Sequence, residues 1–141
     1  MEREHPGRAI DLGTGSGLLA IAAARLGVAE ILAVDQDAEA IASAIANARR
    51  NDVAARVHCV VADAASIETE PAPLVVADLL TAVHAQFATR YSRLVTPGGT
   101  IVLGGILETE ASALGAALAR EGLGLRERLT IDEWTTLALS R

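Results

Sequence analysis

Asp11-Leu-Gly-Thr-Gly-Ser-Gly17 is the stretch of sequence that decides the fold. An apolar strand pattern at residues 8–12 leads into it, and an alanine-rich run at residues 17–26 follows, so a strand is expected to turn directly into a helix. Three glycines at alternate positions let the backbone bend sharply and approach a ligand without obstruction by Cβ atoms. The stretch therefore predicts a small-molecule site at the N-terminus of a helix.

The glycine spacing indicates which kind of ligand to expect. A dinucleotide fingerprint has the form Gly-x-Gly-x-x-Gly, with its third glycine where Leu18 stands in this chain. The observed form, acidic-x-Gly-x-Gly-x-Gly, is similar to the motif of S-adenosylmethionine (AdoMet)-dependent methyltransferases. This spacing disfavours a nicotinamide-dependent reductase. A tight turn that binds nothing is the alternative reading of the glycines alone.

Composition narrows the class of protein. The chain has 141 residues, 51% of them hydrophobic, and a net charge of −6, so residues 1–141 are expected to form a single domain with a buried core. We expect a cytoplasmic protein, because no apolar run is long enough for a membrane span and no secretory leader is seen. An acidic chain without a basic stripe is not expected to bind nucleic acid directly. Cys59, in an apolar run, is expected to be a core thiol, and no metal site is expected.

Strand and helix patterns alternate along most of the chain, which favours a parallel sheet covered by helices. The expected strands are residues 8–12, 31–34, 57–61, 74–77 and 100–103, and the expected helices are residues 17–26, 38–51, 81–94 and 108–121. Asp37 is expected to cap the second helix, and Pro97-Gly-Gly99 is expected to turn into the fifth strand. Residues 125–129 and 134–139 are predicted to be antiparallel, because four residues are too few for a crossover helix.

Carboxylates follow the second and third expected strands, at the edge where ligands bind in open α/β sheets. Asp35 is interpreted as the acceptor of the ribose hydroxyls, with Gln36 beside it; helix capping is the alternative role. Asp63 is interpreted as the acceptor of the adenine amino group, with Ala64 beside it; a solvated loop acid is the alternative. These residues join Gly13, Thr14, Gly15 and Gly17 in the predicted cofactor site.

Asp11 and Asp78 complete the candidate site. A carboxylate inside an apolar strand needs donors, so Asp11 is expected to order the glycine turn through backbone N–H groups and to help receive the methionine end of the cofactor. Asp78, with Leu79, follows the fourth strand and is the candidate catalytic group and a cofactor contact; it is equally well explained as the cap of the following helix. His84 is interpreted as a surface histidine, and Trp134 as a core or sheet-edge residue in preference to a substrate-stacking one.

Three stretches together resemble the bacterial ribosomal protein L11 methyltransferase family. They are the glycine motif with its Leu-Ala-Ile-Ala-Ala helix, Pro97-Gly-Gly followed by Leu103-Gly-Gly-Ile-Leu107, and Glu133-Trp134. The resemblance implies a three-layer αβα, Rossmann-like class I methyltransferase fold with strand order 3-2-1-4-5-7-6 and strand 7 antiparallel. It also implies AdoMet as cofactor and N-methylation of a ribosomal protein at lysine or an α-amine. Methylation of a small molecule and a non-catalytic AdoMet-binding module are the alternatives.

The sequence departs from that family in two places. Asp78-Leu79-Leu80 stands where the family has Asn-Ile-Leu, and an ionised Asp only accepts hydrogen bonds, whereas an amide also donates. The family's N-terminal domain and the helix preceding the first strand have no counterpart in this sequence. We therefore expect apolar residues of strands one, four and five to be exposed, with a homodimer or a missing N-terminal partner covering them.

Overall fold

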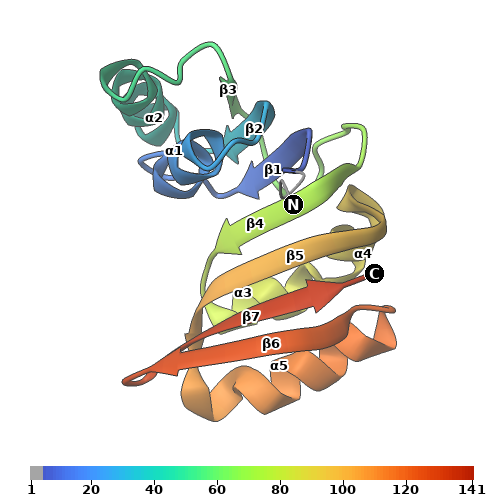
Figure 1. Cartoon of the computed structure of the whole chain (residues 1–141). Coiled ribbons are helices and arrows are strands. Elements are labelled where there is room, and N and C mark those ends of the chain that lie inside the picture. The colour runs from blue at the N-terminus through green and yellow to red at the C-terminus, as the bar shows by residue number, and fades with distance from the viewer. Residues whose placement is uncertain (1–4) are drawn as a thin grey trace. The chain divides into compact units, whose positions relative to one another are not determined.

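A computed structural model of the chain describes residues 5–141, which fall into two compact units, residues 5–68 and residues 69–141 (Figure 1). Each unit is described by itself. The expectation of a single domain stays a prediction.

The first unit holds three parallel strands in the order β3-β2-β1. They are β1 (Arg8–Leu12), β2 (Glu30–Asp35) and β3 (Val57–Val61), and their register pairs Ile10 with Leu32 and Leu32 with His58. Helix α1 (Leu18–Arg25) follows β1 and helix α2 (Ala38–Arg50) follows β2. Both helices contact these strands and each other. The apolar side chains of β1 are buried, as are those of β2 except Leu32.

Helix α2 begins where the sequence predicted. The Oδ1 atom of Asp37 accepts a hydrogen bond from the backbone N–H of Glu39 at 2.9 Å, which satisfies one of the donors that a helix start leaves open. The predicted cap is therefore confirmed. Cys59 is half-buried on β3, the margin strand of the sheet, so the expected packed core thiol is wrong. Burial and the nearby carboxylate of Asp11 raise the pKa of that thiol.

The second unit holds four strands in the order β4-β5-β7-β6. They are β4 (Ala72–Asp78), β5 (Val95–Leu107), β6 (Gly124–Ile131) and β7 (Trp134–Ser140). Strand β4 is parallel to β5, and β7 is antiparallel to both β5 and β6. The predicted antiparallel hairpin is thus confirmed, with a shorter link than the expected residues 130–133: only residues 132 and 133 separate β6 from β7.

Helices α3 (Thr81–Gln86), α4 (Ala88–Leu94) and α5 (Glu108–Arg120) pack along one face of these four strands (Figure 1). The side chains that the strands direct toward this face are buried, among them Val75, Ile101, Leu103, Leu137 and Leu139. The single helix expected at residues 81–94 is wrong, because Phe87 interrupts it. The N–H of Phe87 bonds to the carbonyl oxygens of both Val83 and His84, which tightens that turn and ends α3.

Strand β5 is longer than the predicted strand at residues 100–103. Ala72 pairs with Val95 and Leu74 with Thr100, so three more residues lie on β5 than on β4 between these pairs. Pro97, which has no N–H to donate, and Gly98, with φ of 77°, bulge out of the ladder at this place. The predicted turn is therefore a bulge inside one strand.

Across both units the strand order is β3-β2-β1-β4-β5-β7-β6, with β7 antiparallel, which confirms the predicted topology. The longest helices of residues 5–141, α2 and α5, have 13 residues each, too few to cross a bilayer.

The apolar side chains of β1 are buried, so the exposure expected for strand one is wrong. On strands four and five, Leu74 and Val102 are partly exposed, and Leu107 at the end of β5 is 36% exposed. Every residue of β6 is exposed, including Leu125 at 51%, Leu129 at 57% and Ile131 at 65%. Within the second unit, the most exposed apolar side chains of the sheet therefore lie on the edge strand β6. A homodimer stays a prediction.

Candidate functional site

The glycine turn between β1 and α1 has the backbone that its sequence predicts. Gly13, Gly15 and Gly17 have φ angles of 70°, 56° and 86°, in the left-handed region that favours glycine. The N–H of Thr14 donates to the carbonyl oxygen of Val34 at 2.9 Å, and the N–H of Gly17 donates to that of Thr14 at 2.9 Å. The turn is thereby tied to the end of β2.

Helix α2 presses against the far side of this turn. A Cβ atom at Gly17 would lie 3.1 Å from the Cβ atom of Ala44. Three residues further along α2, the side-chain amide of Asn47 donates to the carbonyl oxygen of Ser16 at 2.9 Å. Ala44 and Asn47 were not predicted as site residues; the signal in the sequence was their spacing of three residues, which places both on one face of a helix.

The opposite side of the turn is open. A Cβ atom at Gly15 would meet no atom within 4 Å. Helix α1 begins after Gly17 with no side-chain cap, so N–H groups of its first turn are available to an anionic group of a ligand. This cradle fits the amino-acid end of AdoMet, which carries a carboxylate.

Asp35 holds the glycine turn in shape. Its Oδ2 atom accepts from the N–H of Gly15 at 2.9 Å, and its Oδ1 atom accepts from the N–H of Asp37 at 3.0 Å. Each carboxylate oxygen accepts more than one hydrogen bond, so both keep capacity for ribose hydroxyls. The bond to Gly15 was missed in the sequence, because it joins residues twenty positions apart.

Asp11 is buried, and its Oδ2 atom accepts from the hydroxyl of Thr14 at 2.7 Å. This bond links β1 to the glycine turn, but its donor is the Thr14 hydroxyl, where backbone N–H groups were expected. This bond also gives Thr14 a definite place in the site, since the hydroxyl holds the backbone between Gly13 and Gly15. The role of Asp11 at the cofactor stays a prediction.

Asp63 and Ala64 lie just beyond β3. The Oδ1 atom of Asp63 accepts from the N–H of Ala65 at 2.9 Å, and the backbone makes one turn at residues 63–67. The N–H of Ala62 donates to the carbonyl oxygen of Asp35 at 3.0 Å, which extends the pairing of β2 with β3. Gln36 is exposed beside Asp35. The adenine role of Asp63 stays a prediction, together with contacts by Gln36 and Ala64.

Asp78 and Leu79 belong to the second unit. Asp78 is exposed at the end of β4, where it pairs with Gly104 of β5. Gly105 has φ of 73°, and a Cβ atom there would lie 2.6 Å from the carbonyl oxygen of Leu79 and 2.7 Å from Oδ1 of Asp78. Helix α3 has Leu80 as its cap residue and no side-chain cap bond, so the helix-cap explanation of Asp78 is wrong.

His84 is fully buried, and the expectation of a surface histidine is wrong. Its Nε2 atom lies 2.7 Å from the carbonyl oxygen of Gly104, and its Nδ1 atom lies 2.7 Å from the hydroxyl of Tyr91. A carbonyl oxygen only accepts, so Nε2 carries the proton and the Tyr91 hydroxyl donates to Nδ1. The sequence signal was the spacing of His84 and Tyr91, which are seven residues apart and therefore two helical turns.

Burial governs the protonation of this pair. Desolvation lowers the pKa of His84, partly offset by its bond to the Gly104 carbonyl and by the negative charge of Asp78. Burial also raises the pKa of Tyr91. Both groups are therefore neutral near pH 7, and they fasten α3 and α4 to the Gly104 position of β5.

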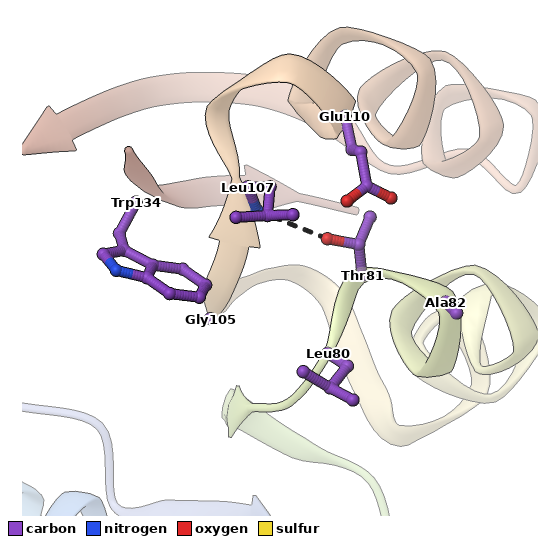
Figure 2. Close-up of a pocket in the computed structure, with 7 residues that line it drawn as sticks. All are labelled: Leu80, Thr81, Ala82, Gly105, Leu107, Glu110 and Trp134. Carbon is purple, nitrogen blue, oxygen red and sulfur yellow. Dashed lines mark hydrogen bonds between the residues drawn. The ribbon is translucent and has the colours of Figure 1, made fainter. Parts of the chain in front are cut away.

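Trp134 lies at the start of β7 with 48% of its surface exposed, so of the expected core or sheet-edge packing the core alternative is wrong. It lines a pocket of about 230 Å³ in the second unit (Figure 2). The other lining residues are Leu80, Thr81, Ala82, Gly105, Leu107 and Glu110.

The strand order, the antiparallel seventh strand and the glycine turn after the first strand define the class: an AdoMet-dependent methyltransferase fold of class I. The family model described as "Ribosomal protein L11 methyltransferase (PrmA)" matches residues 1–141. The chain belongs to the ribosomal protein L11 methyltransferase family.

Known proteins similar to the chain agree with this assignment. The ribosomal protein L11 methyltransferase of Pelotomaculum thermopropionicum is 41% identical over 94% of the chain and 43% of its own length. A ribosomal protein L11 methylase from Lactobacillus delbrueckii subsp. bulgaricus superposes with a TM-score of 0.92 at 26% identity, covering 98% of this chain and 70% of that one. An RNA methyltransferase from Salinibacter ruber, solved with S-adenosyl-L-homocysteine, shares the fold with a TM-score of 0.75 at 21% identity, covering 93% and 78%. The chain spans about half the length of the curated relatives it matches.

Proposed function

We propose that the chain binds AdoMet at the glycine turn and transfers its methyl group to an amine of a protein, with a ribosomal protein as the substrate and the cytoplasm as the place of action. The observation that carries the proposal is the turn itself. Asp35 and Asn47 hold its backbone in place, while the space beside Gly15 is open. The names of the relatives, which are ribosomal protein L11 methyltransferases, supply the class of acceptor.

In this proposal the first unit binds the cofactor. Asp35 accepts hydrogen bonds from the ribose hydroxyls, and the N–H groups at the start of α1 receive the carboxylate of the methionine end. Asp11 and Thr14 keep the turn in its binding conformation. Asp63, with Gln36 and Ala64, contacts the adenine. Bound AdoMet supplies an electrophilic methyl group.

Asp78 and Leu79 are proposed to place the acceptor. A lysine amine has a reference pKa of about 10.4 and attacks only after it loses its proton. An exposed carboxylate at Asp78 can accept a hydrogen bond from that amine and direct its lone pair, and the side chain of Leu79 contributes an apolar boundary that favours the neutral form. These roles are positioning and exclusion of water.

Calorimetric titration with AdoMet and with S-adenosylhomocysteine tests cofactor binding. We expect Asp35→Ala to weaken binding about tenfold or more, because it removes a charged acceptor of the ribose and the bond to Gly15. Asp37→Ala is the matched control. It removes the α2 cap but keeps the Asp37 N–H that donates to Asp35, so binding should stay within about twofold. Equal binding by wild type and Asp35→Ala would contradict the ribose role.

Transfer of labelled methyl groups from AdoMet to ribosomal protein L11 tests the activity. Asp78→Ala should keep cofactor binding but lose most transfer, whereas Asp78→Asn, which keeps an accepting oxygen, should keep transfer. Cofactor binding without transfer to any protein or small amine would contradict the enzyme proposal and support a non-catalytic AdoMet-binding module.

A further inference from the structure

One backbone carbonyl of the second unit, that of Gly104, accepts hydrogen bonds from two different elements. The Nε2–H of His84 on α3 donates to it at 2.7 Å, and the N–H of Leu79, just after β4, donates to it at 3.4 Å. A carbonyl oxygen has two lone pairs, so it accepts both bonds at once. Gly104 therefore joins β5 to α3 and to the end of β4 at a single point.

The side chain of Asp78 lies against this same stretch of backbone. Gly104 pairs with Asp78 in the sheet, and a Cβ atom on Gly104 would lie 3.2 Å from Oδ1 of Asp78. A Cβ atom on Gly105 would lie 2.7 Å from the same oxygen. Contacts this close leave little space between the carboxylate and the two glycines. A displacement of the Gly104 carbonyl would therefore also displace Asp78.

His84 is held from its other side as well. Its Nδ1 atom accepts from the Tyr91 hydroxyl at 2.7 Å, and both side chains are fully buried. The Tyr91 ring packs edge-on against Phe87, with ring centroids 6.1 Å apart. An imidazole enclosed in this way has no surface for an acceptor or a cofactor, so it acts only through the groups that it holds. An apolar residue would fill the same space without burying two polar nitrogens.

We propose that His84 is a positioning residue for methyl transfer: its Nε2–H fixes the Gly104 carbonyl, and this backbone in turn fixes Asp78 and Leu79 at the acceptor. The inference rests on the proposed function for the role of Asp78. Tyr91 contributes by holding the ring so that Nε2 faces the carbonyl. Desolvation lowers the pKa of His84, and the bond to Gly104 and the charge of Asp78 oppose this shift, as expected for groups that lie close together.

Steady-state transfer of labelled methyl groups from AdoMet to ribosomal protein L11 tests this role. His84→Leu removes the donor and should lower kcat about tenfold, with KM for AdoMet unchanged within about twofold. His84→Gln, whose side-chain N–H can reach the Gly104 carbonyl, should recover most of the lost rate. Tyr91→Phe keeps that donor but no longer holds the ring, so it should lower kcat by about threefold.

The Asp78→Ala background separates positioning from a general structural role. If His84 acts through Asp78, adding His84→Leu to Asp78→Ala should lower the residual transfer by less than about twofold, because the group that His84 places is already gone. A purely structural role would lower transfer about tenfold in both backgrounds. His58→Leu, the same change at an exposed histidine of β3, is the matched control and should alter neither rate. Equal losses in both backgrounds, or a wild-type kcat in His84→Leu, overturn the proposal.

Amide hydrogen exchange measures the same link with neither cofactor nor acceptor. The N–H of Leu79 shares the Gly104 carbonyl with His84, so His84→Leu should speed exchange at Leu79 about tenfold and change the amides of β7 by less than about twofold. Unchanged exchange at Leu79, or equal acceleration throughout the second unit, overturns the inference. Acceleration at Leu79 in a chain whose wild type transfers no methyl group supports the link from His84 to the Leu79 backbone and contradicts the proposed function alone.

Discussion

Replacing Gly17 by alanine should destabilise the first unit through two separate costs. Gly17 has φ of 86°, and an L-residue in this region costs about 1–2 kcal/mol. The new Cβ atom would lie 3.1 Å from Cβ and 3.3 Å from Cα of Ala44, which is fully buried on α2 and has no side-chain torsion with which to move away. Overpacking of this kind costs about 1–3 kcal/mol. We expect a total of roughly 2–5 kcal/mol.

Two further glycines separate these costs. Gly15→Ala meets the backbone cost alone, because φ is 56° and no atom lies within 4 Å of the new Cβ, so we expect a loss of about 1–2 kcal/mol. Gly115 lies inside α5 with open space around it. Gly115→Ala should therefore stabilise the second unit by about 0.5–1 kcal/mol.

Urea unfolding followed by far-UV circular dichroism measures all three changes. Trp134 fluorescence follows the second unit separately, since Trp134 lies in that unit. Gly17→Ala and Gly15→Ala should both lower the urea midpoint seen by circular dichroism, Gly17→Ala by more than Gly15→Ala. Gly115→Ala should raise the urea midpoint seen by Trp134 fluorescence. A loss for Gly17→Ala no greater than that for Gly15→Ala would refute the packing of α2 against the glycine turn.

Two more predictions concern the second unit. The folded state holds the pKa of His84 below its ordinary value of 6.5, so the unfolded state binds the proton more readily, and stability should fall as pH drops below about 6.5. Thermal unfolding at pH 7.5 and 5.5 should show a smaller difference in Tm for His84→Gln than for wild type; an equal difference would contradict the buried neutral imidazole. Gly105→Ala should cost roughly 2–4 kcal/mol, because its Cβ atom would lie 2.6 Å from the Leu79 carbonyl oxygen. A urea midpoint for Gly105→Ala equal to that of wild type would show that Gly105 is not packed tightly against the backbone of Leu79.

Local signals in the sequence were enough for most of the first unit. The glycine turn, the Asp37 cap and the bounds Val57–Val61 of β3 each depend on residues close together in the chain. Backbone conformation and helix capping are local properties, so the local sequence pattern predicts them. The bonds from Gly15 to Asp35 and from Asn47 to Ser16 depend on how distant elements meet, and the sequence does not encode them as a motif.

The second unit shows where local reasoning fails. A helical pattern at residues 81–94 does not reveal the tightened turn at Phe87. The polarity of His84 suggested the surface, but Tyr91 and the Gly104 carbonyl satisfy both ring nitrogens inside the fold. The apolar character of Trp134 suggested the core or the sheet edge, and the side chain is half exposed in a pocket. For His84 the partners of the side chain outweighed its average preference.

Strand β6 ends the sheet with every residue exposed. An exposed edge strand offers unpaired backbone N–H and C=O groups to any other extended chain. The exposed side chains of Leu125, Leu129 and Ile131 would add apolar contacts to such a pairing. Between them stand Arg126, Glu127 and Arg128, whose charges would have to give up water if another strand docked against them. These charges act as gatekeepers against aggregation. The same eight residues that leave the sheet open thus also reduce the tendency of copies of the chain to join into fibrils.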